Sequence, residues 1–250
     1  MMISLVHPSR QRLARAEAAI AEWRANASGT LPIEHILSVD ADDPDLAGYR
    51  QLAARSGSRL VAHPNRRMVD AMNRGAAAAT GDLLIGMSDD FGCPEQWDLR
   101  LAEIVGGRKD AAVLVHDGID ARILTIPILT RSIYQRLGYI YHPAYMSMFA
   151  DDDLTEVVRG MNALVDARHL VFPHRHVSVS LDAPDDTYAR QNSNRAWWHG
   201  WRVFEKRKLE RFGAGPRSLE VRGRQLTVDI YYYVRITGSR IKRLWIGAAS

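Results

Sequence analysis

Two adjacent carboxylates, Asp89 and Asp90, follow a short apolar run at residues 83–87. An apolar stretch that turns polar only at its end is typical of a buried strand in a parallel sheet. Open α/β sheets bind ligands at that carboxyl edge. Neighbouring carboxylates repel each other unless a cation or ligand hydroxyls share the site, so the pair indicates a divalent metal and a phosphorylated substrate. The alternative interpretation is a helix N-cap beside a solvated acid.

Other polar groups stand at the ends of segments that we expect to be strands: Ser9 with Arg10, Asp40, and His116 with Asp117. Because parallel strands bring their carboxyl ends to one edge, these side chains would converge on the same crevice as the acidic pair. The convergence favours a functional interpretation of the pair. It adds less for Asp40, which could be an ordinary cap of the turn that follows.

The first half of the chain alternates strand-like and helix-like segments. We expect strands at residues 3–7, 33–39, 59–62 and 82–87, and helices at 12–25, 42–55, 68–79 and 94–104. Strands alternating with helices of this length predict an α/β fold, with a mainly parallel sheet covered by helices on both faces.

The second half is less regular. We expect strands at residues 111–115, 122–129 and 169–172, and helices at 130–137 and from Asp151 to Val158. Pro127 indicates that the strand at 122–129 lies at a sheet edge, since proline has no N–H to give to a ladder. The run 226–234 has the apolar content of a strand.

The composition is that of an ordinary soluble globular protein, with 46% hydrophobic and 25% charged residues. A single cysteine, Cys93, excludes an internal disulfide and fits a reducing compartment. The apolar start of the chain is too short for a signal peptide, and no apolar run reaches the length of a membrane span. We therefore expect a cytoplasmic protein.

Charge is unevenly distributed along the chain. Residues 201–250 hold twelve Lys and Arg against four acidic residues, whereas the first 200 residues hold 21 against 25. A basic tail on an acidic body predicts an anionic partner for the tail, with a solvated basic terminus as the alternative.

Several of these motifs, in this order and spacing, resemble the nucleotide-sugar half of a GT-A glycosyltransferase. The likeness is to the large inverting family 2, and it covers residues 2–180. It rests on Pro8-Ser9-Arg10, Asp40, Asn65, the run 71–75, Gly81-Asp82, Ser88-Asp89-Asp90 and the run 149–154. Two positions depart from the family pattern. Ser88 replaces the first carboxylate of the usual Asp-x-Asp, and Ala150 stands where an acidic residue often precedes the catalytic one.

The resemblance implies a GT-A domain at residues 1–195, with a nucleotide-sugar half at about 1–115 and an acceptor half at about 116–195. A basic and aromatic extension follows at 196–250. It also implies that Asp40 reads the nucleobase, that Asp89 contacts the ribose or assists the metal, and that Asp90 binds Mn²⁺ or Mg²⁺. The implied donor site comprises Pro8, Ser9, Arg10, Arg12, Asp40, Asn65, Arg67, Asn73, Ser88 and Asp89. Arg10, Arg12 and Arg67 would contact phosphate, or could be ordinary surface arginines.

Three consecutive acids open the expected helix at 151. Helix dipoles favour acids in a first turn whatever the function. By the resemblance, Asp151 is the base that takes the acceptor's proton, with Asp152 as the second candidate and Asp153 as the helix cap. His174 and His176 follow the last strand, and alternate residues of an extended segment face the same way. In related transferases a histidine in this region completes the metal shell, and solvent-facing histidines are the alternative.

The resulting hypothesis is a metal-dependent hexosyltransferase that uses a nucleoside-diphosphate sugar, with a UDP-sugar favoured and inversion expected. One rival is a phage-type enzyme that glycosylates hydroxymethylated DNA bases, and another is an inactive nucleotide-binding protein. The tail mixes aromatic with basic residues, which suits a nucleic acid, an anionic lipid or polysaccharide, or plain packing. We expect Arg202, Lys206, Arg207 and Lys208 to contact an anionic acceptor, although helical spacing turns Lys208 away from Arg202 and Lys206. The oligomeric state is left open.

Overall fold

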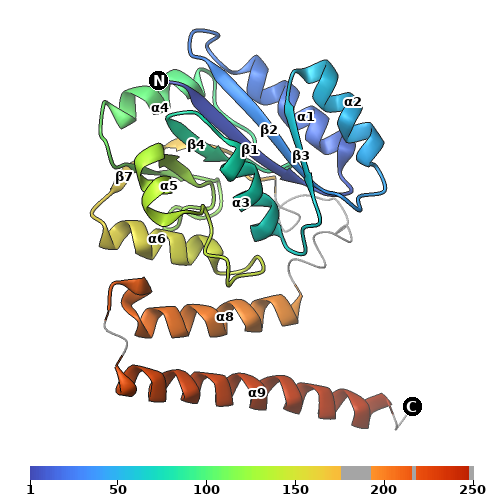
Figure 1. Cartoon of the computed structure of the whole chain (residues 1–250), viewed down its shortest axis with the longest axis vertical. Coiled ribbons are helices and arrows are strands. Elements are labelled where there is room, and N and C mark those ends of the chain that lie inside the picture. The colour runs from blue at the N-terminus through green and yellow to red at the C-terminus, as the bar shows by residue number, and fades with distance from the viewer. Residues whose placement is uncertain (176–192, 216–217, 248–250) are drawn as a thin grey trace.

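Seven strands form one mixed sheet among the residues that the structure describes, which are 1–175, 193–215 and 218–247 of this computed structural model (Figure 1). The spatial order is β3-β2-β1-β4-β6-β5-β7. The strands are β1 Ile3–Ser9, β2 Ile33–Asp40, β3 Arg59–His63, β4 Leu83–Gly86, β5 Ala112–His116, β6 Ile128–Thr130 and β7 Leu164–Val171.

The first four strands of the chain are mutually parallel, and β6 runs antiparallel to both of its neighbours. The carboxyl ends of β1, β2 and β4 therefore lie at one edge, as predicted. The strand predicted at 122–129 is wrong in extent and place, because β6 covers only 128–130 and lies inside the sheet, between β4 and β5. Pro127 just precedes β6, and its carbonyl accepts a hydrogen bond from the N–H of Gly86 at 2.8 Å. Pro127 therefore does not require a position at the sheet edge, because only its carbonyl oxygen takes part in hydrogen bonding to β4.

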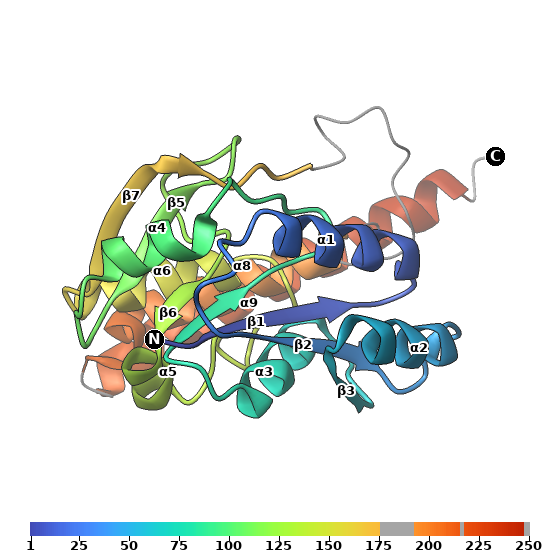
Figure 2. The same ribbon diagram turned by 90° about the horizontal axis from the view of Figure 1, so that it is seen from above.

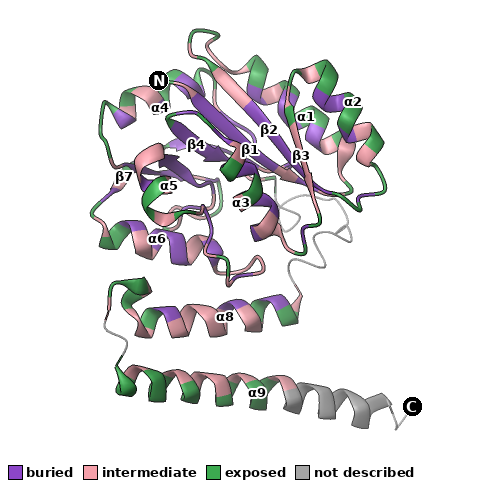
Figure 3. Cartoon of the chain, in the orientation of Figure 1, coloured by how far each residue is buried: buried purple, intermediate pink, exposed green. Residues whose placement is uncertain are grey.

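Helices cover both faces of the sheet (Figure 2). They are α1 Leu13–Ala25, α2 Leu46–Ser56, α3 Met68–Ala78, α4 Trp97–Val105, α5 Arg131–Leu137 and α6 Ala150–Gly160. Successive side chains of a strand point to opposite faces of the sheet. Ile3 and Leu5 of β1 pack with α1 and α4, whereas Val6 packs with α3, α5 and α6. The central strands β1, β2, β4, β5 and β6 are consequently mostly buried, whereas the edge strands β3 and β7 are partly exposed (Figure 3).

The C-terminal part of the described chain is helical: α8 Asn194–Leu209, the short 3-10 helix η1 Arg211–Gly213, and α9 Leu219–Gly247. α8 packs on α6, and α9 lies along the other side of α8 (Figure 1). The strand-like interpretation of 226–234 is therefore wrong. Leu226, Ile230 and Tyr233 recur at intervals of four and three, which suits one face of a helix. In the described part of the chain, no helix is long and apolar enough to cross a membrane.

The ion pairs of the tail also differ from what the sequence predicted. Arg202 and Lys206 of α8 both bond to Asp229 of α9, at 2.5 and 3.1 Å, and Arg207 pairs with Asp153 of α6. These cations hold α8 against its two neighbours. Lys208, the fourth expected contact, is exposed.

Candidate active site

A cavity of about 500 Å³ opens at the carboxyl ends of β1, β2 and β4. Its walls come from the turns after these strands, from the start of α3, from the N-terminus of α6 and from α8. Of the predicted site residues, the structure brings together Pro8, Ser9, Arg10, Arg12, Asp40, Arg67, Ser88, Asp89, Asp90, Asp151, Asp152 and His174.

Asp89 is held at both carboxylate oxygens. His7 Nε2 lies 2.9 Å from Oδ1, and the Ser9 hydroxyl donates to Oδ2 at 3.1 Å. Ser9 Oγ is in turn 2.8 Å from the Tyr49 hydroxyl. All these side chains are buried, so the carboxylate has one fixed orientation and presents little free surface to a ligand.

A chain of polar contacts continues from His7 into the sheet. His7 Nδ1 lies 3.2 Å from His35 Nε2, and His35 Nδ1 lies 2.8 Å from the Ser58 hydroxyl. Burial, reinforced by the nearby His7, lowers the pKa of His35 well below its ordinary value. A neutral His35 can relay one hydrogen bond through each ring nitrogen. We did not predict a role for His7, although a polar residue inside an otherwise apolar strand was a visible signal.

Asp90 points toward His174, and its Oδ2 lies 3.7 Å from His174 Nε2 and 3.9 Å from Arg12 Nη1. The Ser88 hydroxyl donates to Oδ1 at 2.6 Å. Burial favours the neutral acid, but the His174 ring and the Ser88 hydroxyl outweigh it and lower the pKa of Asp90 to about 2. The carboxylate is therefore ionised at neutral pH.

Phe91 and Asp117 hold the ring of His174 in place. Its ring stacks on Phe91 with centroids 4.2 Å apart, and its Nδ1 lies 3.9 Å from Oδ2 of the buried Asp117. A carboxylate behind an imidazole is the usual support of a metal-binding histidine. His176, the other histidine predicted for the metal, lies outside the described residues.

The donor chemistry of Asp90 and His174 fits a divalent cation. One carboxylate oxygen and one imidazole nitrogen face each other across 3.7 Å, and a neutral imidazole suits Mn²⁺ better than Mg²⁺. Within the part of the chain that the structure describes, no cluster of three or more His, Cys, Asp or Glu forms a metal-binding group. The remaining ligands would have to be phosphate oxygens and waters, as is usual where such an ion binds a diphosphate.

At the carboxyl end of β2, Asp40 is paired with Arg10. Arg10 Nη1 donates to Asp40 Oδ2 at 2.5 Å and to Asp42 Oδ1 at 2.6 Å. Asn65 is buried behind this point and donates from Nδ2 to the Val39 carbonyl at 3.1 Å, without lining the cavity. Asp40 thus presents a carboxylate that is already ordered.

Asn73 lies outside the cavity. It fixes the loop after α5 by accepting from the N–H groups of Ile140 and Tyr141 and donating to the Tyr141 carbonyl. Arg67 does line the cavity, but its guanidinium already bonds to Asp70 and to the carbonyls of Pro143 and Tyr145.

The acids at the start of α6 have different environments. Asp151 lines the cavity, and burial, followed by the charge of Asp152, raises its pKa to about 7. Burial also raises the pKa of Asp152. Asp153 turns into the core, where it accepts from the Tyr145 hydroxyl at 3.0 Å and pairs with Arg207. The cap predicted for Asp153 is therefore wrong, because the N-cap position of α6 is Phe149.

Part of the cavity wall near the start of α6 is apolar. This apolar wall is formed by Met148, Phe149 and Trp197 of α8, and the ring centroids of Phe149 and Trp197 are 5.5 Å apart. Phe149 has a φ of +68°, a conformation that non-glycine residues seldom adopt and that often accompanies functional sites. We did not predict that the C-terminal extension reaches the cavity, because no local pattern places a distant helix against a loop.

Comparison with known proteins settles the family. Residues 4–164 match the model of glycosyl transferase family 2. The chain belongs to this family. The match covers more than half of the 250 residues, and it confirms the resemblance drawn from the motifs.

Solved structures similar to this family 2 chain have the same GT-A fold. A mannosyltransferase from Pyrobaculum calidifontis, in complex with GDP-Man and Mn²⁺, is 14% identical with a TM-score of 0.56, covering 93% of this chain and 70% of its own. Glucosyl-3-phosphoglycerate synthase from Mycobacterium tuberculosis, in complex with Mn²⁺, UDP and glucosyl-3-phosphoglycerate, is 17% identical with a TM-score of 0.55, covering 87% and 81%.

S. aureus TarS is 11% identical with a TM-score of 0.55 over 69% of this chain, and the family 2 chain spans only 36% of the TarS chain. At these identities the likeness shows the fold. Among curated protein sequences no match is found.

Proposed function

We propose that this family 2 chain transfers a sugar from a nucleoside-diphosphate sugar to an acceptor hydroxyl, with inversion and with a divalent cation. One observation carries the proposal. The same cavity is lined by two residues that could bind a divalent cation, Asp90 and His174, and by Asp151, whose carboxyl group has a pKa of about 7. The first would hold the leaving diphosphate, and the second would serve the attacking hydroxyl.

Asp90 and His174 would hold the cation, preferably Mn²⁺. A bound divalent ion would neutralise the negative charge that builds on the departing nucleoside diphosphate. Arg12, which lies beside Asp90, would add a positive charge at the same place. Two of the similar structures contain Mn²⁺ with a nucleotide or nucleotide-sugar, which supports this part of the proposal.

Asp151 would take the proton of the acceptor hydroxyl as its oxygen attacks the anomeric carbon opposite the leaving group. A general base works best when its pKa lies near the working pH, and burial brings Asp151 there. The apolar wall of Met148, Phe149 and Trp197 would cover the acceptor and exclude water.

Asp40 would read the nucleobase by accepting an N–H at its carboxylate while Arg10 holds the other side. A uracil offers one such N–H, so we propose a UDP-sugar. A guanine also offers donors at its pairing edge, so a GDP-sugar is the alternative to include in the assay.

The DNA-modifying alternative is not favoured, because three of the four basic residues expected to grip the duplex form ion pairs within the chain. The inactive alternative rests on Ser88 and Ala150. Ser88 supports Asp90 by a hydrogen bond, and the base assigned here is Asp151 itself, so neither departure removes a required group.

Calorimetry with UDP and with GDP, with and without Mn²⁺, tests the donor site, and donor-sugar hydrolysis tests turnover. Asp90→Ala and His174→Ala should abolish the dependence of nucleotide binding on Mn²⁺. The exposed residues Asp166 and His169 provide matched controls, since Asp166→Ala and His169→Ala lie outside the cavity. Mn²⁺-independent binding by the wild-type chain, or no hydrolysis of either donor, would contradict the proposal.

A further inference from the structure

The described part of α9 has two chemically different faces. Its inner face is fastened to α8: Asp229 bonds to Arg202 and Lys206, and Tyr231 packs against Trp201 with ring centroids 5.3 Å apart. Gln225 adds hydrogen bonds to Glu210 and to the Lys206 carbonyl. These contacts fix which side of α9 is turned outward.

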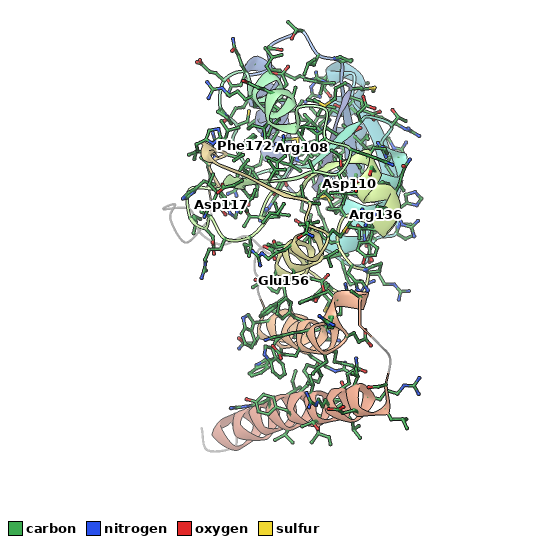
Figure 4. The ribbon with its side chains drawn as sticks, turned by 90° about the vertical axis from the view of Figure 1, so that its left-hand side faces the viewer. Arg108, Asp110, Asp117, Arg136, Glu156 and Phe172 are labelled. Carbon is green, nitrogen blue, oxygen red and sulfur yellow. The ribbon has the colours of Figure 1, made fainter. Side chains whose placement is uncertain are left out.

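The outer face carries an apolar stripe of Leu219, Leu226, Ile230, Tyr233 and Val234, with side chains between 56 and 84% exposed. Intervals of three, four and seven place these residues on one side of a helix, whereas Gln225 and Tyr231 are on the side that faces α8. Tyr233 lies at the margin of the stripe, where its ring centroid is 5.7 Å from the Arg202 guanidinium of α8. Side chains project from the side of α9 that faces away from α8 (Figure 4), and most of the described α9 is exposed (Figure 3). An exposed row of large apolar side chains marks an interaction surface.

Charge identifies the kind of surface that would cover the stripe. Residues 219–250 contain six Lys and Arg against two acids, and one of those acids, Asp229, is already used by α8. The exposed Arg222 borders the stripe on one side. The exposed Arg224 lies further round on the other side, beside Glu220. A helix with an apolar face and a net positive charge is the pattern of a segment that lies in the interface of an anionic membrane.

We propose that the outer face of α9 docks on an anionic lipid surface. The stripe would enter the boundary between headgroups and acyl chains, and Tyr233 would lie at headgroup level, where tyrosine is enriched. α8 would then lie between the lipid and the catalytic domain. Trp197 of α8 would bring one wall of the cavity near that surface. Pairing with a second copy through the same face is disfavoured, because it would bring together two segments of the same net positive charge.

Flotation of the full chain with lipid vesicles tests this proposal, and it needs neither a sugar donor nor turnover. We expect binding to vesicles of phosphatidylcholine with 30% phosphatidylglycerol, weak binding to phosphatidylcholine alone, and weaker binding as salt rises. Leu226→Glu and Ile230→Glu together should lower the partition coefficient by about tenfold or more. Both side chains are exposed, so the fold should survive, which circular dichroism would verify.

Leu99→Glu is the matched control, because Leu99 is an exposed leucine of α4, on the catalytic domain. It should bind vesicles like the wild-type chain. The proposal is overturned if the wild-type chain does not float with anionic vesicles, or if the Leu226 and Ile230 variant floats as well as the control. It is also overturned if light scattering shows a dimer that those two substitutions dissociate while vesicle binding is absent.

Discussion

Arg207 of α8 and Asp153 of α6 form a buried ion pair, with relative exposures of 9 and 1%. The guanidinium engages both carboxylate oxygens, and Nη2 lies 3.1 Å from Oδ1. The Tyr145 hydroxyl donates to the same carboxylate at 3.0 Å. The pair joins the C-terminal helices to the helix whose first turn carries Asp151.

The first prediction concerns this pair. Arg207→Met should lower the free energy of unfolding by about 3–5 kcal/mol, because it leaves the buried Asp153 carboxylate without its cation. Urea denaturation measures the change. Arg211→Met is the control, since Arg211 is exposed, and it should change stability by less than about 0.5 kcal/mol. Equal effects of the two substitutions would show that the buried pair is not needed for stability.

The second prediction concerns His7. His7→Phe keeps an aromatic ring, although a larger one, and removes both the nitrogen 2.9 Å from Asp89 Oδ1 and the nitrogen 3.2 Å from His35 Nε2. Because the buried carboxylate loses one hydrogen-bond partner, the free energy of unfolding should fall by about 1–3 kcal/mol. Because Asp89 also lines the cavity, nucleotide affinity should fall as its orientation is lost. Calorimetry and urea denaturation measure the two effects, and exposed His169→Phe should show neither.

The third prediction is a pH dependence that arises from Asp151. Its pKa of about 7 lies above the ordinary 3.8, so the folded chain binds more protons than the unfolded chain between these values. Stability from this group is therefore full at low pH and is lost as pH rises through about 7. Asp151→Asn should be more stable than wild type at pH 8 and equal to it near pH 4. Thermal denaturation across that range measures the difference.

The same titration should appear in activity. Donor turnover should rise with pH to a plateau above about 7, where Asp151 is ionised, and Asp151→Asn should lower the plateau by a factor on the order of 10². Asp152→Asn is the comparison. If that variant loses turnover while Asp151→Asn keeps it, the base is Asp152.

The sequence predicted the parts of the site that depend on strand order. Asp40, Asp89 and Asp90 follow apolar runs, and parallel pairing brings the ends of such runs together without further information. His174 was expected from its place after the last strand. The role of His7 was not expected from the sequence. Its contact with His35 depends on the register of two strands that are distant in sequence.

The missed features of the second half have a different cause. The antiparallel strand β6 is inserted between β4 and β5, although it follows both of them in sequence, and only tertiary pairing places it there. Asp153 looked like a cap because helix starts favour acids, but its partner Arg207 stands 54 residues away. The place of Trp197 in the cavity wall depends on the same docking of α8.

The last prediction compares two glycines of the C-terminal helices. In α8, a Cβ on Gly200 would lie 2.4 Å from the Met148 carbonyl oxygen and 2.8 Å from the Phe149 ring, whereas a Cβ on Gly223 of α9 would meet nothing within 4 Å. Gly200→Ala must therefore push α8 off the loop before Asp151, and it should destabilise the chain by about 1–3 kcal/mol. Gly223→Ala should instead stabilise it by about 0.5–1 kcal/mol, since alanine favours an exposed helix. Urea denaturation measures both changes.

The Gly200 variant should also lose donor turnover, because the wall formed by Phe149 and Trp197 moves away from Asp151. Opposite signs of the two stability changes are the expected result, and stabilisation by both would mean that α8 does not pack closely on the active-site loop.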